Sequence, residues 1–287
     1  MYWQKTFEVA GIKVLVESDA VTCLESLQAV TKLYHEIEAC SDVDVTFSIR
    51  VDGDCLSLVL NDEKVLWTCL DARDIPPALE IHIYYQVLER TYPTYLALHA
   101  ACVRFGDIAC VFAGISGAGK SSICTAALLT GASYFTDEFT LVGASGDVYP
   151  FPRPLQWDEV THPAFSHQSM LASGAFSQYA LNFVDATTHQ ISTSNYWLPE
   201  NIQTNSVPLK AFVLPEYGAH YPNAMITPLR RSEVLMALPE HVHIHFPDSS
   251  DIHQANQRIP KDCKFYRVQF SDVHEAWKLV AETLSSI

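Results

Sequence analysis

The segment GISGAGKS at residues 114–121 constrains this chain more than any other feature of its sequence. It fits the pattern G-x-x-x-x-G-K-[ST], in which the backbone N–H groups of a glycine-rich loop surround an anion. The apolar segment IACVFAG precedes it, and SSICTAALLT, with the composition of a helix, follows it. A chance glycine-rich turn is the alternative interpretation, but a strand, a loop and a helix in this order favour a phosphate-binding loop.

Each residue type in the loop has a physical reason. The glycines allow backbone with positive φ and let the chain approach phosphate oxygens closely. Lys120 is expected to reach the β- and γ-phosphates, and the hydroxyl of Ser121 to bind Mg²⁺. The loop residues expected to bind a nucleotide are Gly114, Ser116, Gly117, Ala118, Gly119, Lys120, Ser121 and Ser122.

Two neighbouring acids, Asp137 and Glu138, end the short predicted strand ASYF. A carboxylate beside bound phosphate can hold Mg²⁺ or accept a proton from an attacking hydroxyl. Two adjacent carboxylates repel each other, which raises the pKa of one of them. A solvated strand end is the alternative interpretation.

His99 lies in the apolar segment LHAACV, one predicted strand before the loop. If the two strands are neighbours in a sheet, its imidazole lies beside the acid pair and tunes it. Taken alone, a histidine in an apolar strand is more often a satisfied core residue.

The charge of the chain excludes some classes of partner. Its 18 Lys and Arg against 33 Asp and Glu give a formal charge of −15. A field of this sign repels nucleic acid and anionic lipid, so we expect neither as a partner. The eight cysteines form no CxxC pair and no zinc spacing, and the N-terminus lacks an apolar signal region. These features predict a cytoplasmic protein without a membrane segment.

The chain divides into a small N-terminal α+β domain at 1–92 and a main domain at 93–287. In the first domain, alternating apolar residues at 43–51 and a second run at 55–60 predict a hairpin. One helix is predicted from Thr22, with Glu25 completing a capping box, and another after Pro76 and Pro77.

The second half of the chain gives weaker signals. Residues 158–205 are rich in polar residues and are interpreted as long loops with one short helix. The C-terminal segment predicts an amphipathic helix capped by Ser271 or Asp272. In HVHIHF, the residues His241, His243 and His245 would share one face of a strand, either as metal ligands or, more often, as a half-exposed sheet face.

Three motifs, LHAACV, FAGISGAGKSS and YFTDE, together resemble the HPr serine kinase/phosphorylase family and its HPr-kinase-related relatives. A Pro-Arg-Pro element at 152–154 resembles a further motif of those relatives. The resemblance covers roughly residues 95–155. It implies a fold like the C-terminal domain of phosphoenolpyruvate carboxykinase, with ATP or GTP, Mg²⁺ and a hydroxyl acceptor. It also implies that His99 and Asp137 match the catalytic His and Asp, and that Arg153 contacts phosphate or acceptor.

The chain departs from the family at two places. Glu138 stands where HPr kinases usually carry a second aspartate, and the C-terminal signature of true HPr kinases is not recognisable. The first departure affects the geometry of the metal, and the second argues against HPr itself as the substrate. The small N-terminal domain looks more like that of relatives that modify ribosomally made peptides.

These observations predict an α/β protein, α+β overall, with a P-loop kinase domain and a small N-terminal α+β unit. The expected activity is transfer of the γ-phosphoryl group of a Mg-nucleotide to a serine hydroxyl of a peptide or protein. Lys120 would hold phosphate, Ser121, Glu138 and Asp137 would be the metal residues, and Asp137 would be the base, oriented by His99. A catalytically silent nucleotide-binding regulatory module and a small-metabolite kinase remain as alternatives, and assembly into a homo-oligomer stays open.

Overall fold

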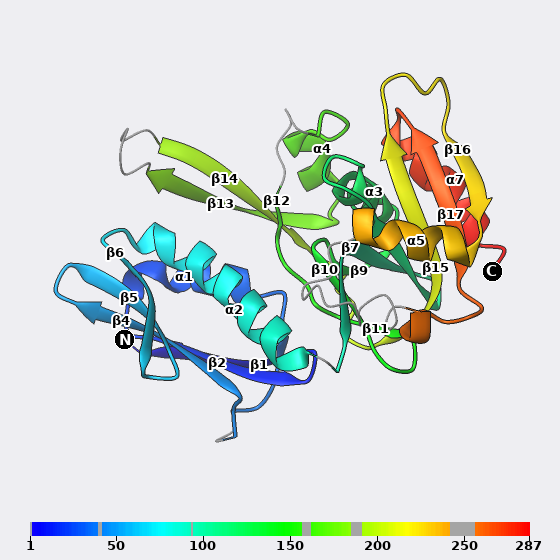
Figure 1. Ribbon diagram of the computed structural model, residues 1–287. Helices are drawn as coiled ribbons and strands as arrows, with labels where there is room; N and C mark the ends of the chain where they lie inside the picture. The colour runs from blue at the N-terminus through cyan, green and yellow to red at the C-terminus, as the bar shows by residue number, and fades with distance from the viewer. Residues whose placement is uncertain (1, 40–41, 93, 157–161, 185–190, 242–255) are drawn as a thin grey trace. The chain divides into compact units, whose positions relative to one another are not determined.

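The computed structural model describes residues 2–39, 42–92, 94–156, 162–184, 191–241 and 256–287. They form a mixed α+β structure with several sheets and separate into two compact units (Figure 1). The first unit is Met1–Tyr92 with Gln178–Leu198, and the second is Pro93–Ser177 with Pro199–Ile287. None of the helices in the described part of the chain has the length and apolar composition that a bilayer crossing requires.

The first unit is built on a six-stranded sheet in the order β3-β1-β2-β4-β5-β6. Strands β2 and β4 run parallel, and the other neighbours run antiparallel. Helices α1 and α2 both lie on one face of this sheet (Figure 1). The elements are β1 (Trp3–Val9), β2 (Ile12–Ser18), α1 (Leu24–Thr31), β3 (His35–Glu36), β4 (Val45–Asp52), β5 (Cys55–Leu60), β6 (Lys64–Cys69) and α2 (Ile75–Thr91).

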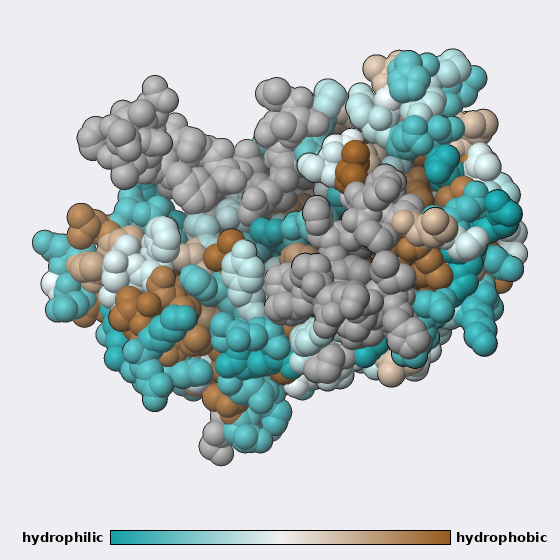
Figure 2. All heavy atoms as spheres, in the orientation of Figure 1, coloured by the Kyte–Doolittle hydropathy of each residue, from teal (hydrophilic) through white to brown (hydrophobic). Residues whose placement is uncertain are grey.

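The core of the first unit follows the predicted alternation in β4. Val45, Phe47 and Ile49 are buried, but Val51, expected on the same face, is 48% exposed near the end of the strand. Apolar residues also reach the surface of this unit, brown among teal in Figure 2. On β6 and α2 the exposed large apolar side chains are Val65, Trp67, Ile81 and Tyr85.

Both predicted helices of the first unit exist, but their starts differ from the prediction. Helix α2 was expected after Pro76 and Pro77 and begins just before them, at Ile75, with both prolines in its first turn. The capping box of Thr22 and Glu25 does not form, because residues Val21–Cys23 make a 3₁₀ turn that takes Thr22 into helical backbone. Cys23 then precedes α1 without a side-chain cap.

The second unit contains a sheet in the order β11-β10-β7-β8-β15-β17-β16, with β9 paired to β7. Strand β15 runs parallel to both β8 and β17, whereas β7 is antiparallel to β8, β9 and β10. The strands are β7 (Leu96–Phe105), β8 (Ile108–Ala113), β9 (Ser133–Thr136), β10 (Phe139–Val142), β11 (Asp147–Tyr149), β15 (Val207–Tyr217), β16 (Met225–Leu229) and β17 (Lys264–Phe270), and the two-residue strand β12 (Leu155–Gln156) lies outside this sheet.

Strand β8 is apolar on both faces because helices cover both sides of the sheet. Ala109, Val111 and Ala113 join a core that also contains Val234 of helix α5 (Arg231–His241). On the opposite face, α3 (Lys120–Leu129) packs against α7 (Val273–Leu284), and the ring of Phe112 lies 6.4 Å from that of Trp277 on α7. The strand that leads into the phosphate loop is therefore covered by helices on both faces.

The C-terminal helix α7 is capped as predicted. The side chain of Asp272 accepts hydrogen bonds from the N–H groups of His274 and Glu275, at 2.8 and 3.1 Å. The indole N–H of Trp277 donates to Thr130 Oγ1 at 2.7 Å, which ties α7 to the end of α3.

The prediction of long loops at 158–205 was wrong for much of that segment. After the short helix α4 (His167–Ala172), the chain forms two neighbouring strands, β13 (Phe176–Val184) and β14 (Ile191–Pro199). Serine, threonine and asparagine residues interrupt the apolar alternation by which a strand is recognised in a sequence. Such polar strands form because they pair with a neighbouring strand, which strand propensity alone does not record. His241 ends helix α5 instead of beginning a strand, and His243 and His245 lie outside the described residues.

Candidate functional site

The segment predicted to bind phosphate connects the end of β8 to the start of α3. Gly117 and Gly119 adopt left-handed backbone, with φ of 81° and 98°. A Cβ on Gly119 would come within 2.6 Å of the Phe270 ring, so this position requires glycine for space as well. Gly114 was also expected at positive φ, but it is not among the left-handed glycines. A Cβ there would lie 3.1 Å from that of Ala118, so Gly114 allows the two ends of the loop to come close together.

Gly119 is also the residue that precedes α3, and no side chain caps this helix start in the described structure. No acidic residue occupies the first turn either. The first N–H groups of a helix lack partners within the helix and carry its positive dipole end. The start of α3 is therefore suited to an anion.

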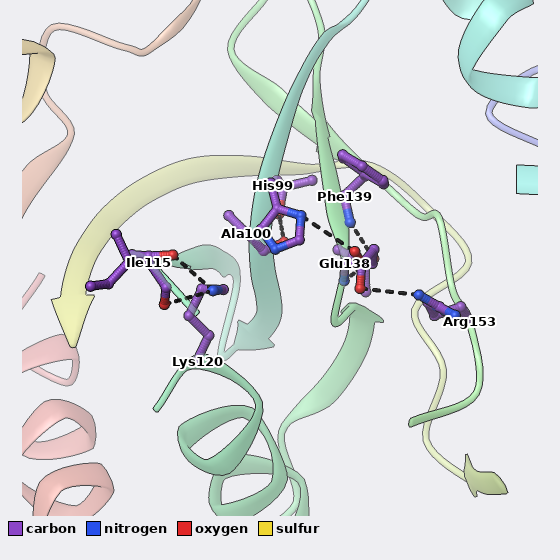
Figure 3. Close-up of polar contacts among 10 residues, drawn as sticks. His99, Ala100, Ile115, Lys120, Glu138, Phe139 and Arg153 are labelled. Atoms are coloured by element: carbon purple, nitrogen blue, oxygen red, sulfur yellow. Dashed lines mark hydrogen bonds and ion pairs between the residues drawn. The ribbon is translucent and has the colours of Figure 1, made fainter. Parts of the chain in front are cut away.

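Lys120, the first residue of α3, is buried and folds back onto the loop. Its Nζ donates to the carbonyl oxygens of Gly114 at 2.8 Å and Ile115 at 3.1 Å (Figure 3). Burial lowers the pKa of Lys120, while the negative charges of Asp137 and Glu138 raise it. The ammonium group is thus held within the loop, at the place where phosphate charge would be neutralised.

Asp137 follows β9 and lies against the start of α3. The nearby Ser121 hydroxyl acts on this side chain as a hydrogen-bond donor in lowering its pKa. Oxygen Oδ1 is buried and has no hydrogen-bond partner among the described residues. Burial raises the pKa of Asp137 to about 7; the Ser121 hydrogen bond and the charges of Arg153 and Lys120 lower it, and Glu138 raises it. The structure thus brings the predicted base and the predicted metal-binding hydroxyl together.

Glu138 forms a second cluster with the predicted residues His99 and Arg153 (Figure 3). Glu138 Oε1 lies 3.3 Å from His99 Nδ1, and Oε2 accepts a hydrogen bond from Arg153 Nη1 at 3.0 Å. The three side chains meet because β10 pairs with β7, which places Phe139 opposite His99. The Tyr134 hydroxyl donates to the Arg153 carbonyl oxygen at 2.8 Å and holds the arginine segment in place. His99 was expected to orient Asp137, but its Nδ1 contacts the adjacent acid, Glu138.

The remaining predicted residues lie along the loop. Ser116 and Ala118 line a pocket of about 400 Å³ on the β15 side of the loop. Ser122 is half-buried in the first turn of α3. The same pocket is lined by residues that sequence reasoning missed, namely Leu214, Pro215, Glu216, Tyr217 and Arg267. Their signal was the position of Pro215–Tyr217 at the end of a long apolar strand, where ligands of parallel sheets usually bind.

The oxygen donors of the site fit a hard divalent ion. Mg²⁺ prefers one or two carboxylates and hydroxyl or phosphate oxygens, and Asp137 supplies a buried carboxylate oxygen with no described partner, beside the Ser121 hydroxyl. Within the described ranges no group of three or more His, Cys, Asp and Glu residues converges. A metal held here would therefore depend on phosphate oxygens for part of its coordination.

Comparison of the chain with protein-family models and with curated proteins finds no match.

Proposed function

We propose that the chain is a kinase that transfers the γ-phosphoryl group of a Mg-nucleotide, ATP or GTP, to a serine hydroxyl of a peptide or protein. The observation that carries this proposal is the contact between Ser121, at the start of α3, and the buried carboxylate of Asp137. A phosphate loop alone only binds, whereas a loop with an adjacent proton acceptor can also transfer.

The phosphates would lie on the glycine-rich loop, with the N–H groups of the α3 start and the ammonium of Lys120 directed at them. Lys120 would exchange the carbonyl oxygens of Gly114 and Ile115 for phosphate oxygens. Charge-assisted hydrogen bonds to phosphate are stronger than those to neutral carbonyls, so this exchange favours binding. Ser121, Asp137 and Glu138 would hold Mg²⁺, which when bound neutralises charge on the phosphate oxygens.

In the transfer step, the acceptor serine oxygen forms a bond to the γ-phosphorus while the bond to the β–γ bridging oxygen breaks. The serine proton passes to Asp137, and the nucleoside diphosphate leaves with the electron pair of the broken bond. The His99 contact and the Arg153 ion pair fix the Glu138 side chain next to Asp137.

A nucleotide-binding regulatory module is the second candidate. It is favoured by the contacts of Glu138 with His99 and Arg153, which engage both of its carboxylate oxygens and leave them less available to a metal.

The test is a transfer assay with purified protein, γ-labelled ATP or GTP, Mg²⁺ and a pool of serine-containing peptides. Label incorporated into serine by the wild type, but not by Asp137→Asn, supports the kinase. Tight binding of Mg-nucleotide with no label in any peptide supports the regulatory module. Absence of nucleotide binding overturns both.

A further inference from the structure

We propose that the pocket between the phosphate loop and the ends of β15 and β17 binds the nucleoside part of the nucleotide, with the base held between Ile115 and Tyr217. This inference rests on the proposed function, because it assumes that the loop holds phosphates.

The order of the strands indicates how a bound nucleotide would be oriented. Strand β8, which leads into the loop, has β7 on one side and β15 on the other. Glu138 and His99 lie on the β7 side, since His99 is on β7 and Glu138 immediately precedes β10, the partner of β7. The pocket belongs to the second side, since it is lined by Leu214–Tyr217 of β15 and Arg267 of β17. A nucleotide with its γ-phosphate toward Asp137 therefore directs its opposite end to the pocket.

The lining of the pocket has the chemistry of a base site. Its walls are mostly apolar, and two of the lining side chains, Ile115 and Tyr217, are 56% and 52% exposed. Flat heterocycles bind by stacking on aromatic and apolar side chains, with a few polar groups to fix their edges. A volume of about 400 Å³ accommodates a group of this size.

A pair of half-exposed charged side chains supplies the polar groups. Glu216 Oε2 lies 3.8 Å from Arg267 Nε and accepts a hydrogen bond from Gln269 Nε2 at 3.1 Å. The Tyr221 hydroxyl also donates to Glu216. The Tyr221 hydrogen bond is the main reason that the pKa of Glu216 is lowered, so this carboxylate is an ionised acceptor. Beside the guanidinium of Arg267, it presents both an acceptor and donors, as the edge of a base or the hydroxyls of a ribose require.

The pocket is also connected to the loop by direct contacts. The N–H of Tyr217 donates to the carbonyl oxygen of Ala118 at 3.2 Å. The Phe270 ring, 5.8 Å from the Tyr217 ring, packs against Gly119. The wall of the pocket and the phosphate loop therefore keep a defined spacing, as one ligand that spans both requires.

The experiment compares two ligands by calorimetry in the presence of Mg²⁺: a nucleoside triphosphate, with ATP and GTP measured separately, and tripolyphosphate, which lacks the nucleoside. Tyr217→Ala should weaken binding of the preferred triphosphate about tenfold and leave tripolyphosphate unchanged, because stacking is lost and the loop is intact. Tyr217→Phe should bind like the wild type. Tyr85→Ala, at a tyrosine of similar exposure on α2, is the matched control.

Two results would overturn the pocket while leaving the phosphate loop standing. One is wild-type protein that binds tripolyphosphate as tightly as ATP and GTP. The other is Tyr217→Ala that loses both ligands equally or neither. If the wild type binds no triphosphate and no tripolyphosphate, the proposed function itself fails. Because Tyr217 is half exposed, its truncation leaves the core in place, and a thermal melt checks this.

Discussion

The ammonium group of Lys120 donates a hydrogen bond to the carbonyl oxygen of Gly114, 2.8 Å away, at the opposite end of the same loop. The lysine is buried, and burial lowers its pKa. A buried cation gains more binding free energy from contact with a phosphate than an exposed cation does, because water competes less for the cation.

Lys120→Ala should therefore weaken binding of Mg-triphosphate at least about tenfold, since each charge-assisted contact contributes about 1.5–3 kcal/mol. Calorimetry with ATP and GTP measures the change. Lys278→Ala, at an exposed lysine of α7, is the control and should bind normally. Unchanged affinity in Lys120→Ala would remove the loop from the proposed site.

Asp137→Asn should abolish phosphoryl transfer and leave triphosphate affinity within a few-fold of the wild type. The amide keeps the shape of the side chain but cannot accept the proton, and a group that acts mainly in the transition state affects rate more than binding. Transfer kinetics and calorimetry on the same preparation separate the two effects. Wild-type transfer rates in the variant would assign the base to another residue.

The same substitution should change how stability depends on pH. Because the folded pKa of Asp137, about 7, exceeds its ordinary value of 3.8, the folded state keeps a proton that the unfolded chain has lost. Stability therefore falls as pH rises through this window, and the loss is complete above the folded pKa. Asp137→Asn should be more stable than the wild type by at least about 1 kcal/mol at pH 8, with the gain disappearing near pH 4.

Urea unfolding at both pH values, without nucleotide or divalent ion, measures this difference. Asp54→Asn, at an exposed aspartate in a turn of the first unit, controls for the general loss of one negative charge. An equal gain at pH 4 and pH 8 would contradict a buried Asp137 with a raised pKa.

Gly119→Ala should destabilise the protein by about 2–4 kcal/mol, because it combines two costs. The left-handed backbone costs about 1–2 kcal/mol for any residue with a Cβ, and the contact with the buried Phe270 ring adds an overpacking cost. Gly131 has φ of 97°, against 98° at Gly119, but open space around its Cβ direction. Gly131→Ala should therefore cost only the backbone part, about 1–2 kcal/mol. Equal losses of stability for the two variants in chemical denaturation would show that the Phe270 ring moves aside to accept the extra methyl group.

The ion pair of Arg153 with Glu138 should give a coupling energy of about 1 kcal/mol in a double-mutant cycle. The side chains are 20% and 31% exposed, so the pair is screened less than a surface pair and desolvated less than a buried one. The cycle uses Arg153→Gln, Glu138→Gln and the double variant, with stability measured in urea. Additive losses would mean that the two side chains are neighbours without mutual stabilisation.

Local features of the chain were predictable from the sequence because neighbouring residues decide them. The strand, loop and helix around 108–129 follow from an apolar run, three glycines and a helical composition. The cap at Asp272 and the prolines in the first turn of α2 act within one turn of their helices. The capping box at Thr22 failed because a competing 3₁₀ turn used the same residues.

The arrangement of the site depended on pairings between distant segments, which no local pattern records. His99 meets Glu138 only because β10 pairs with β7, and Arg153 reaches the same carboxylate from a later segment. The pocket beside the loop exists because β15, almost a hundred positions beyond β8 in the chain, runs parallel to it, and β17 brings Arg267 alongside. The sequence by itself determined the residue types available for phosphate chemistry, through the local preferences of glycine, lysine and apolar strands. Only the tertiary structure decided which of them meet, because strand pairing and burial, not spacing along the chain, set the distances between charges.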